Sequence, residues 1–262
     1  MADNINSRFL RETELGEIKT ALMSAASHEF NNALSVLKGG VFLLEETTAN
    51  PSDTVRRIYK MMATNIDYLT MATSNLLNMS RIEAGKFRLN RKKTLARDVI
   101  KECERRIVEL ANEKDISIRL EFPPLPLAVD ADPEALTIVI TNLLSNAVKY
   151  TPAKGHILMG VAMPEGTSSG NGKVLIFCKD TGIGISEADQ KKISSDFYRA
   201  KNTEKDVKGF GIGLSIARKI IESHGSRLEL ESEPGEGSVF SFLLPLWKAA
   251  EHESGGEMEN MT

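Results

Sequence analysis

The chain has 262 residues, a length typical of one or two domains, with 41% hydrophobic and 26% charged residues as in ordinary globular proteins. A formal net charge of −3 excludes a basic field for nucleic acid, and no apolar run reaches the length of a membrane span. We therefore expect no contact of this chain with nucleic acid or with a membrane. Cys103 and Cys178 have neither metal-binding nor disulfide spacing, which predicts buried reduced thiols and a cytoplasmic location.

The first third of the chain predicts two long helices joined by a short loop. Residues 12–46 form the first, in which apolar residues recur mostly three, four or seven apart, at Leu15, Ile18, Leu22, Ala26, Ala33, Leu37 and Leu44. Residues 47–51 interrupt the pattern, and Ser52 or Asp53 is placed to cap a second helix. Two helices alone cannot enclose stripes this long, so we expect a homodimer forming a four-helix bundle. A monomeric hairpin packed on its own second domain is the alternative.

His28 lies on the polar side of the first helix, because about 100° of rotation per residue places it opposite the apolar stripe. Glu29 follows it directly, and Asn31 and Asn32 lie on the same polar face. Taken alone, this pattern is also that of an ordinary solvated surface histidine.

After Gly85 and the basic run 88–93 the pattern changes to mixed α and β. It predicts helices over 96–113, 133–150 and 212–224, and strands over 116–122, 156–162, 174–179, 227–233 and 238–244. Ser186 is placed to cap a short helix, and the polar segment 200–208 predicts a mobile lid. The expected organisation is therefore a flexible N-terminal segment (1–11), a helical hairpin domain (12–86), an α/β domain (87–247) and a disordered tail (248–262).

Three segments of the α/β domain carry groups suited to a nucleotide. Asn142, Asn146 and Lys149 recur four and three apart and share one helix face, where amide oxygens can ligate Mg²⁺ and an ammonium can meet phosphate. Asp180 begins an Asp-Thr-Gly-Ile-Gly-Ile string directly after a strand, and its carboxylate can accept a hydrogen bond from an exocyclic amine. Residues 209–214, Gly-Phe-Gly-Ile-Gly-Leu, lead into a helix and can cradle phosphate with backbone N–H groups.

Together and in this order, these strings resemble the sensor histidine kinases. Ser27-His28-Glu29 resembles the H box of that family, and residues 77–85 resemble the end of its second dimerisation helix. Residues 142–150 resemble the N box, 180–185 the first glycine box and 209–214 the second. The resemblance implies an α+β chain: a hairpin forming a dimeric four-helix bundle, then an α/β-sandwich ATP-binding domain of the GHKL type.

The resemblance also implies an ATP-dependent histidine autokinase that passes its phosphoryl group to an aspartate on a response-regulator receiver domain. His28 would be the nucleophile, Glu29 would orient it or accept its proton, and Asn32, with Asn31 as competitor, would support dephosphorylation of the partner. Asn146 would bind Mg²⁺ and Asp180 would read adenine. The implied ATP-binding residues are Asn142, Asn146, Lys149, Tyr150, Asp180, Gly182, Gly184, Ile185, Arg199, Gly209, Gly211, Gly213 and Leu214. The chain would then be cytoplasmic, or the cytoplasmic part of a larger, membrane-bound sensor.

The sequence departs from the family pattern at a few positions. Ala33 stands where a proline is frequent, which predicts a straighter helix, and Ser194 stands where the F box usually begins with phenylalanine. Two alternatives remain: another GHKL ATPase, or a degenerate dimeric scaffold. The related ATPases carry a water-activating glutamate where this chain has Asn142, and an amide cannot serve as a general base.

Overall fold

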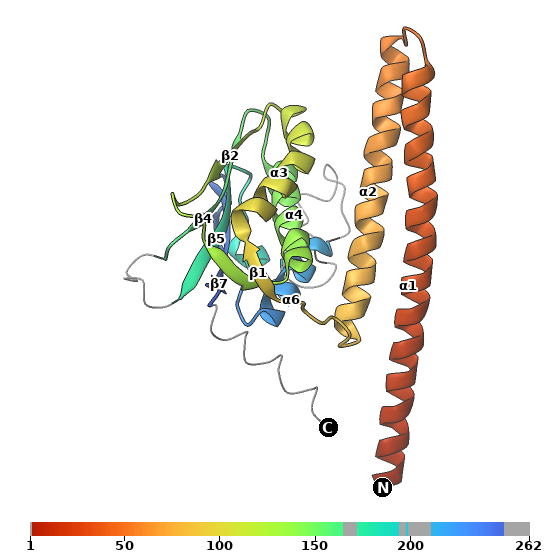
Figure 1. Cartoon of the computed structure of the whole chain (residues 1–262), viewed down its shortest axis with the longest axis vertical. Helices are drawn as coiled ribbons and strands as arrows, with labels where there is room; N and C mark the ends of the chain where they lie inside the picture. Colours follow the sequence, from red (N-terminus) through yellow and green to blue (C-terminus); the bar gives the residue numbers. More distant parts are fainter. Residues whose placement is uncertain (1, 165–171, 194–197, 199–210, 249–262) are drawn as a thin grey trace, which may run out of the picture. The chain divides into compact units, whose positions relative to one another are not determined.

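The chain divides into two compact units, residues 1–88 and residues 89–262, in a computed structural model (Figure 1). The structure describes residues 2–164, 172–193, 198 and 211–248. Within the first helix, the described side chains are those of Met23, residues 25–27 and residues from 29 onward. The predicted lid over 200–208 lies outside the described residues, as does nearly all of the predicted tail over 248–262.

The first unit is a hairpin of two long helices, α1 (Ala2–Thr47) and α2 (Asp53–Glu83). Of the two predicted candidates, Ser52 caps α2, because its Oγ accepts a hydrogen bond from the N–H of Val55 at 3.4 Å. The helix α1 begins at Ala2 rather than at Glu12, so the expectation of a separate flexible segment over 1–11 is corrected. No proline or glycine occurs before Gly16, so nothing in the sequence ends the helix there.

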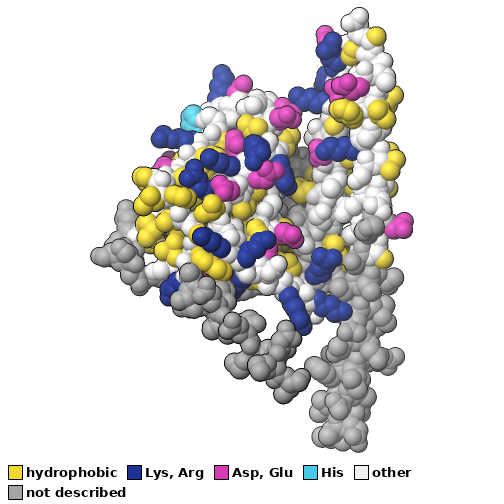
Figure 2. All heavy atoms as spheres, viewed as in Figure 1, with side chains coloured by type: hydrophobic (Ala, Val, Ile, Leu, Met, Phe, Trp, Pro, Cys, Tyr) yellow, Lys and Arg dark blue, Asp and Glu magenta, His cyan; other side chains and the backbone are white. Residues whose placement is uncertain are grey.

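The apolar side chains of the hairpin fall into two sets. One joins α1 to α2 through the buried residues Leu34, Val41 and Ile66, with Tyr59 and Ala63 packed against them. The other consists of large side chains that stay exposed in the single chain: Phe30, Val36, Leu37, Phe42, Leu43 and Leu44 on α1, and Ile58, Met61, Met62, Leu69 and Leu76 on α2. Figure 2 shows such side chains along the hairpin. The exposed set includes Leu37 and Leu44, so part of the predicted stripe faces away from α2, and exposed apolar surface of this extent marks a contact surface.

The second unit is a mixed sheet with helices on one side (Figure 1). Its strands are β2 (Ser117–Glu121), β4 (His156–Ala162), β5 (Lys173–Asp180), β6 (Glu229–Glu233) and β7 (Gly237–Pro245), in the order β2-β4-β5-β7-β6. The pair β2–β4 is parallel and the other pairs are antiparallel. The helices are α3 (Ala96–Asn112), α4 (Pro133–Tyr150), the short α5 (Glu187–Gln190) and α6 (Gly213–Ser223). The predicted class, a helical hairpin followed by an α/β domain, is confirmed.

The core of this unit lies between the sheet and the inner faces of α4 and α6. Alternating residues of the central strands, such as Ile176 and Phe242, are fully buried, as are Leu136 and Ile140 of α4 and Ile216 of α6. Each large apolar side chain removed from water contributes roughly 1.5–3 kcal/mol, so this layer holds the two helices firmly on the sheet. Cys103 and Cys178 are buried free thiols, as predicted.

Two short strands were not predicted. β1 (Lys92–Leu95) and β3 (Ala128–Ala131) pair antiparallel as a separate ribbon beside the main sheet. Four-residue segments are too short for a periodic signal, and their pairing depends on residues more than thirty positions apart. Over the described residues, no helix has both the length and the apolar content needed to cross a membrane.

Candidate nucleotide-binding site

The helix α4 presents the asparagine-rich segment at a defined position over the sheet. Asp132 caps its first turn by accepting hydrogen bonds from the N–H groups of Glu134 and Ala135 at 2.9 and 3.0 Å. Asn142 is buried, whereas Asn146 is half-buried on the same helix. The two amides therefore lie one turn apart, as their spacing predicted.

Asp180 ends the central strand β5 and is buried, with 6% of its surface exposed. Its Oδ1 accepts a hydrogen bond from the N–H of Gly182 at 2.8 Å, and the carboxylate also accepts one from the backbone of Ser238. Burial raises the pKa of this carboxyl, and the two backbone hydrogen bonds oppose the rise. A buried carboxylate held in this way is a suitable acceptor for an exocyclic amine.

The first glycine box is packed against the end of α4. A Cβ atom at Gly182 would lie 2.8 Å from the carbonyl oxygen of Tyr150, and the N–H of Ile183 donates to that same oxygen at 3.2 Å. Gly184 has φ +66°, and a Cβ there would collide with the backbone of Glu233. The two glycines are thus required for the close approach of chain segments to one another.

The second glycine box meets the middle of α4. A Cβ at Gly213, the first residue of α6, would lie 2.6 Å from Oδ1 of Asn142. Leu214 is buried beside it, and Gly211 has φ +70°. The N-terminal turn of α6 therefore lies against the asparagine-rich face, where its backbone N–H groups are suited to phosphate. Gly209 lies outside the described residues.

The segment after the first glycine box is held by side-chain hydrogen bonds. Nε2 of Gln190 donates to the carbonyl oxygens of Ile185 and Ser232 at 2.9 and 2.7 Å. The hydroxyl of Tyr198 donates to Oδ1 of Asp189 at 2.6 Å, which raises the pKa of the tyrosine and lowers the pKa of the aspartate. Arg199, Phe197 and Ser194 lie outside the described residues.

Lys114 supports the site and was not singled out from the sequence. Its Nζ donates to the carbonyl oxygens of Val148, Lys149 and Thr151 at 2.7, 2.9 and 3.2 Å. An ammonium at the carboxyl end of α4 satisfies carbonyl groups that have no intrahelical partner and complements the helix dipole. No local signal reveals this role, because the contacts span more than thirty residues of sequence.

The proposed phospho-acceptor segment lies within α1. His28 is helical, and its side chain is outside the described part of the chain. Glu29 and Asn32 are exposed, whereas Oδ1 of Asn31 accepts a hydrogen bond from Oγ1 of Thr73 at 2.9 Å. The two asparagines therefore differ, since the Asn31 side chain reaches α2.

The donor set fits a magnesium ion only together with a nucleotide. Among the described residues, no group of three or more His, Cys, Asp or Glu side chains is gathered to hold a metal. Amide oxygens on α4 and phosphate oxygens are the hard ligands that Mg²⁺ accepts with its waters. Asn146 is half-buried and available on this face of α4.

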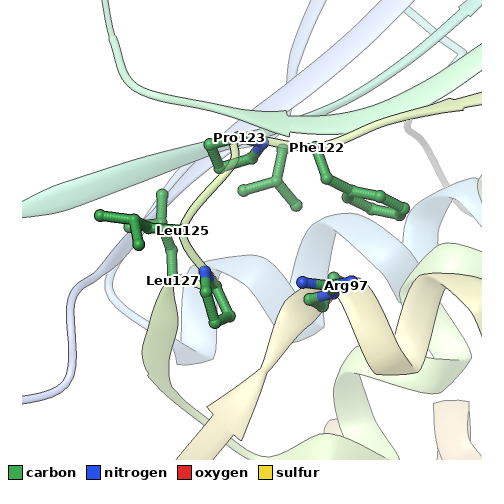
Figure 3. Close-up of a pocket in the computed structure, with 7 residues that line it drawn as sticks. Arg97, Phe122, Pro123, Leu125 and Leu127 are labelled. Atoms are coloured by element: carbon green, nitrogen blue, oxygen red, sulfur yellow. The ribbon is translucent and has the colours of Figure 1, made fainter.

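A small hollow lies at the loop before β3, and its lining differs in chemistry from the nucleotide motifs. It is lined by Arg97, Phe122, Pro123, Leu125, Pro126, Leu127 and Val161. Figure 3 shows Arg97, at the start of α3, near this loop. The Arg97 guanidinium and the Lys101 ammonium each lie 5.9 Å from the centroid of the Phe122 ring. These cation–π contacts link Phe122 to α3. The lining of the hollow is nearly apolar and does not offer groups suited to a triphosphate. On the face shown in Figure 2, acidic and basic side chains of this unit are interspersed.

Both units match known domain families. Residues 18–85 match the His Kinase A (phospho-acceptor) domain, and residues 131–248 match the histidine kinase-, DNA gyrase B- and HSP90-like ATPase family. The sensor protein GacS of Pseudomonas syringae pv. syringae is 32% identical over 242 residues, which cover 91% of this chain and 26% of GacS.

Two further comparisons agree with this match. The histidine protein kinase DivJ of Caulobacter vibrioides is 30% identical over 230 residues, covering 87% of this chain and 37% of DivJ. The crystal structure of full-length ShkA with AMPPNP is similar with a TM-score of 0.65 and 25% identity, over 87% of this chain and 46% of ShkA. This chain thus spans about a quarter to under a half of these proteins. With a phospho-acceptor domain followed by a GHKL-type ATPase domain, the chain belongs to the sensor histidine kinases of two-component systems.

Proposed function

We propose that this chain is a histidine kinase core that uses ATP to phosphorylate His28 and then transfers the phosphoryl group to an aspartate of a response regulator. The observation that carries the proposal is the convergence of three motifs in the second unit. Asn142 of the N box touches Gly213 of the second glycine box, and Tyr150 of the N box bonds to Ile183 of the first. The same chain carries the matched phospho-acceptor domain, in which His28 lies.

The chemistry is an in-line phosphoryl transfer. A neutral imidazole nitrogen of His28 attacks the γ-phosphorus of ATP, so an N–P bond forms while the P–O bond to ADP breaks. Glu29 orients the ring or accepts the proton from its other nitrogen. The receiver carboxylate then attacks the same phosphorus, and the imidazole leaves.

The residues of the second unit would bind and orient the nucleotide rather than react with it. Asp180 would accept a hydrogen bond from the adenine amine, because it is buried and held by the backbone of Gly182. Lys149 would contact phosphate, and the N-terminal turn of α6 would hold the triphosphate through its N–H groups. Asn146 would ligate Mg²⁺, which, when bound, neutralises charge that develops on the phosphate oxygens.

The exposed apolar face of the hairpin supports a homodimer. Ile58, Met62, Leu69 and Leu76 belong to the predicted α2 seam, and each stays at least 39% exposed in the single chain. Packing against the same face of a second copy would bury these side chains in a four-helix bundle. The proposal also implies a cytoplasmic location, where a kinase of this type meets ATP and its response regulator.

The two alternatives lose support from the site. A water-activating GHKL ATPase needs a general base at the position of Asn142, and that amide instead packs against Gly213. A degenerate scaffold would not need the intact N box and glycine boxes that this chain carries. Both features favour a nucleotide-binding kinase.

Radiolabelled γ-phosphate provides the direct test. With Mg²⁺-ATP the chain should label itself, and the label should be acid-labile and alkali-stable, as a phosphoramidate is. The variant His28→Gln should remain dimeric and should not be labelled. Label that persists in this variant would refute the assignment of His28.

We also propose that Asn32, rather than Asn31, supports removal of phosphate from the receiver domain. Asn32 lies one turn after His28 and is exposed, and an amide there can orient a water molecule. Asn31 is engaged with Thr73 of α2. Decay of a phosphorylated receiver, measured with kinase and ADP, should slow in Asn32→Ala while autophosphorylation persists. Slower decay in Asn31→Ala alone would transfer the role to Asn31.

A further inference from the structure

A polar cluster holds the first residues of the second unit against the N-terminus of α4 and the C-terminus of α6. We call it the linker cluster, and it consists of Asn90, Arg91, Asp130, Asp132, Ser223 and His224. The N–H of Asn90 donates to Oδ2 of Asp132 at 2.8 Å. Nη2 of Arg91 donates to the carbonyl oxygen of Ser223 at 3.0 Å, and Nη1 lies 3.8 Å from Oδ2 of Asp130. The chain that follows the hairpin is thus fastened both to α4 and to α6.

Asp132 connects this segment to the helix that carries the N box. One carboxylate oxygen, Oδ1, caps the first turn of α4 through the N–H groups of Glu134 and Ala135. The other oxygen, Oδ2, accepts the N–H of Asn90. A displacement of the linker therefore acts directly on the capping residue of α4.

His224 connects the same point to α6. The ring is 4% exposed, and its Nε2 accepts the backbone N–H of Asp132 at 3.2 Å. Its Nδ1 lies 2.9 Å from the carbonyl oxygen of Ile220, so the neutral ring carries its proton on Nδ1 and donates there. At the other end of α6, Gly213 lies against Asn142. These two contacts fix α6 against the first half of α4, and the nucleotide motifs begin at the second contact, where Gly213 meets Asn142.

The neutral state of the ring is part of this arrangement. Burial lowers the pKa of His224, and the Arg91 guanidinium lowers it further, whereas the carbonyl of Ile220 and the carboxylates of Asp132 and Asp130 oppose the shift. Protonation would turn Nε2 into a donor facing the N–H donor of Asp132. The link between α4 and α6 would then be lost.

We propose that His224 is a positioning residue that couples the linker to the nucleotide site, so that loosening the linker cluster lowers the affinity for ATP. The inference rests on the proposed nucleotide-binding function. According to this proposal, a conformational change in the hairpin is transmitted through the linker cluster to the residues that bind ATP. The coupling runs through Asp132, because the helix cap, the linker backbone and the histidine all bond to that one residue.

The test is calorimetric binding of ATP to the full chain at pH 8 and at decreasing pH, down to the lowest pH at which the chain stays folded. His224→Gln retains an acceptor that can reach the Asp132 N–H but does not titrate, whereas His224→Leu removes the acceptor. We expect His224→Gln to bind as the parent does at pH 8, and more tightly than the parent once the pH falls through the lowered pKa of His224. His224→Leu should bind at least fivefold more weakly at pH 8. Any titration of ATP or of other groups on the chain occurs in both the parent and His224→Gln and does not affect their comparison.

A double-mutant cycle separates coupling from independent structural damage. Arg91→Met should weaken ATP binding at pH 8, and adding it to His224→Leu should cause less than a twofold further loss. Arg106→Met is the matched control, since Arg106 pairs only locally with Glu102 on α3. If the losses of ATP affinity in Arg91→Met and His224→Leu multiply fully in the double variant, the inference is overturned. It is also overturned if the affinity for ATP depends on pH identically in the parent and in His224→Gln. Should His224→Leu not fold, the pH comparison decides alone. Failure of the parent itself to bind ATP would instead refute the proposed function.

Discussion

Replacing Asp180 by asparagine should weaken ATP binding without weakening the fold. The substitution exchanges one carboxylate oxygen for an amide nitrogen, which donates rather than accepts. In the parent, the carboxylate accepts the backbone N–H groups of Gly182, 2.8 Å from Oδ1, and of Ser238, and the remaining amide oxygen can still accept a backbone N–H of this kind. The acceptor offered to the adenine amine is then lost. An unsatisfied buried donor costs about 1–3 kcal/mol, which corresponds to a roughly 5- to 150-fold increase in the Kd for ATP.

The stability of the folded chain should respond in the opposite way. Burial raises the folded-state pKa of Asp180, so the ionised carboxylate is less favourable in the folded than in the unfolded chain. The stability contributed by this group is present below the unfolded pKa and is lost as the pH rises through the folded pKa. At pH 7.5 the neutral amide removes this penalty, and we expect the melting temperature of Asp180→Asn to equal or exceed that of the parent.

Calorimetry with ATP and thermal melting of the same samples at pH 7.5 check both expectations. Asp98→Asn is the matched control, because Asp98 lies exposed on α3 and its substitution should leave both quantities unchanged. An unchanged Kd in Asp180→Asn would refute the adenine role. A lower melting temperature would refute the reasoning about the buried charge.

Three further substitutions probe the supports of the site. Asn146→Asp should change the Mg²⁺ dependence of phosphotransfer while ATP affinity without Mg²⁺ changes less than threefold, as binding with and without the ion will show. Gly213→Ala should weaken ATP binding at least tenfold, because its Cβ would lie 2.6 Å from Oδ1 of Asn142 and displace that side chain. Lys114→Met should lower the free energy of unfolding in urea by about 2 kcal/mol and weaken ATP binding, because the end of α4 that carries Lys149 loses its charged donor. Lys114→Arg should restore part of both quantities. Normal ATP binding in Gly213→Ala or Lys114→Met would contradict the assigned contact.

The sequence by itself determined the elements and their order. Hydrophobic periodicity predicted α3, α4 and α6 within a residue or two of their observed bounds, and Ser52 and Ser186 cap the helices at the predicted positions. The nucleotide motifs were visible for the same reason, since helical spacing alone places Asn142 and Asn146 on one face. Local patterns succeed where the physical cause is local, as in capping, periodicity and glycine-containing turns.

Only the tertiary structure decided which of these pieces touch. The ribbon of β1 and β3, the three carbonyls held by Lys114 and the contact of Gly213 with Asn142 all join residues far apart in the chain. His224 and Asp132 are 92 residues apart, and nothing around either one in the sequence indicates the other. Likewise, the apolar stripe of α1 did not reveal which residues face α2, and Leu34 and Val41 do so while Leu37 remains exposed. These contacts arise when whole helices and strands pack together. The free energy of that packing depends on all the surfaces that meet, so no local sequence pattern predicts which residues will touch.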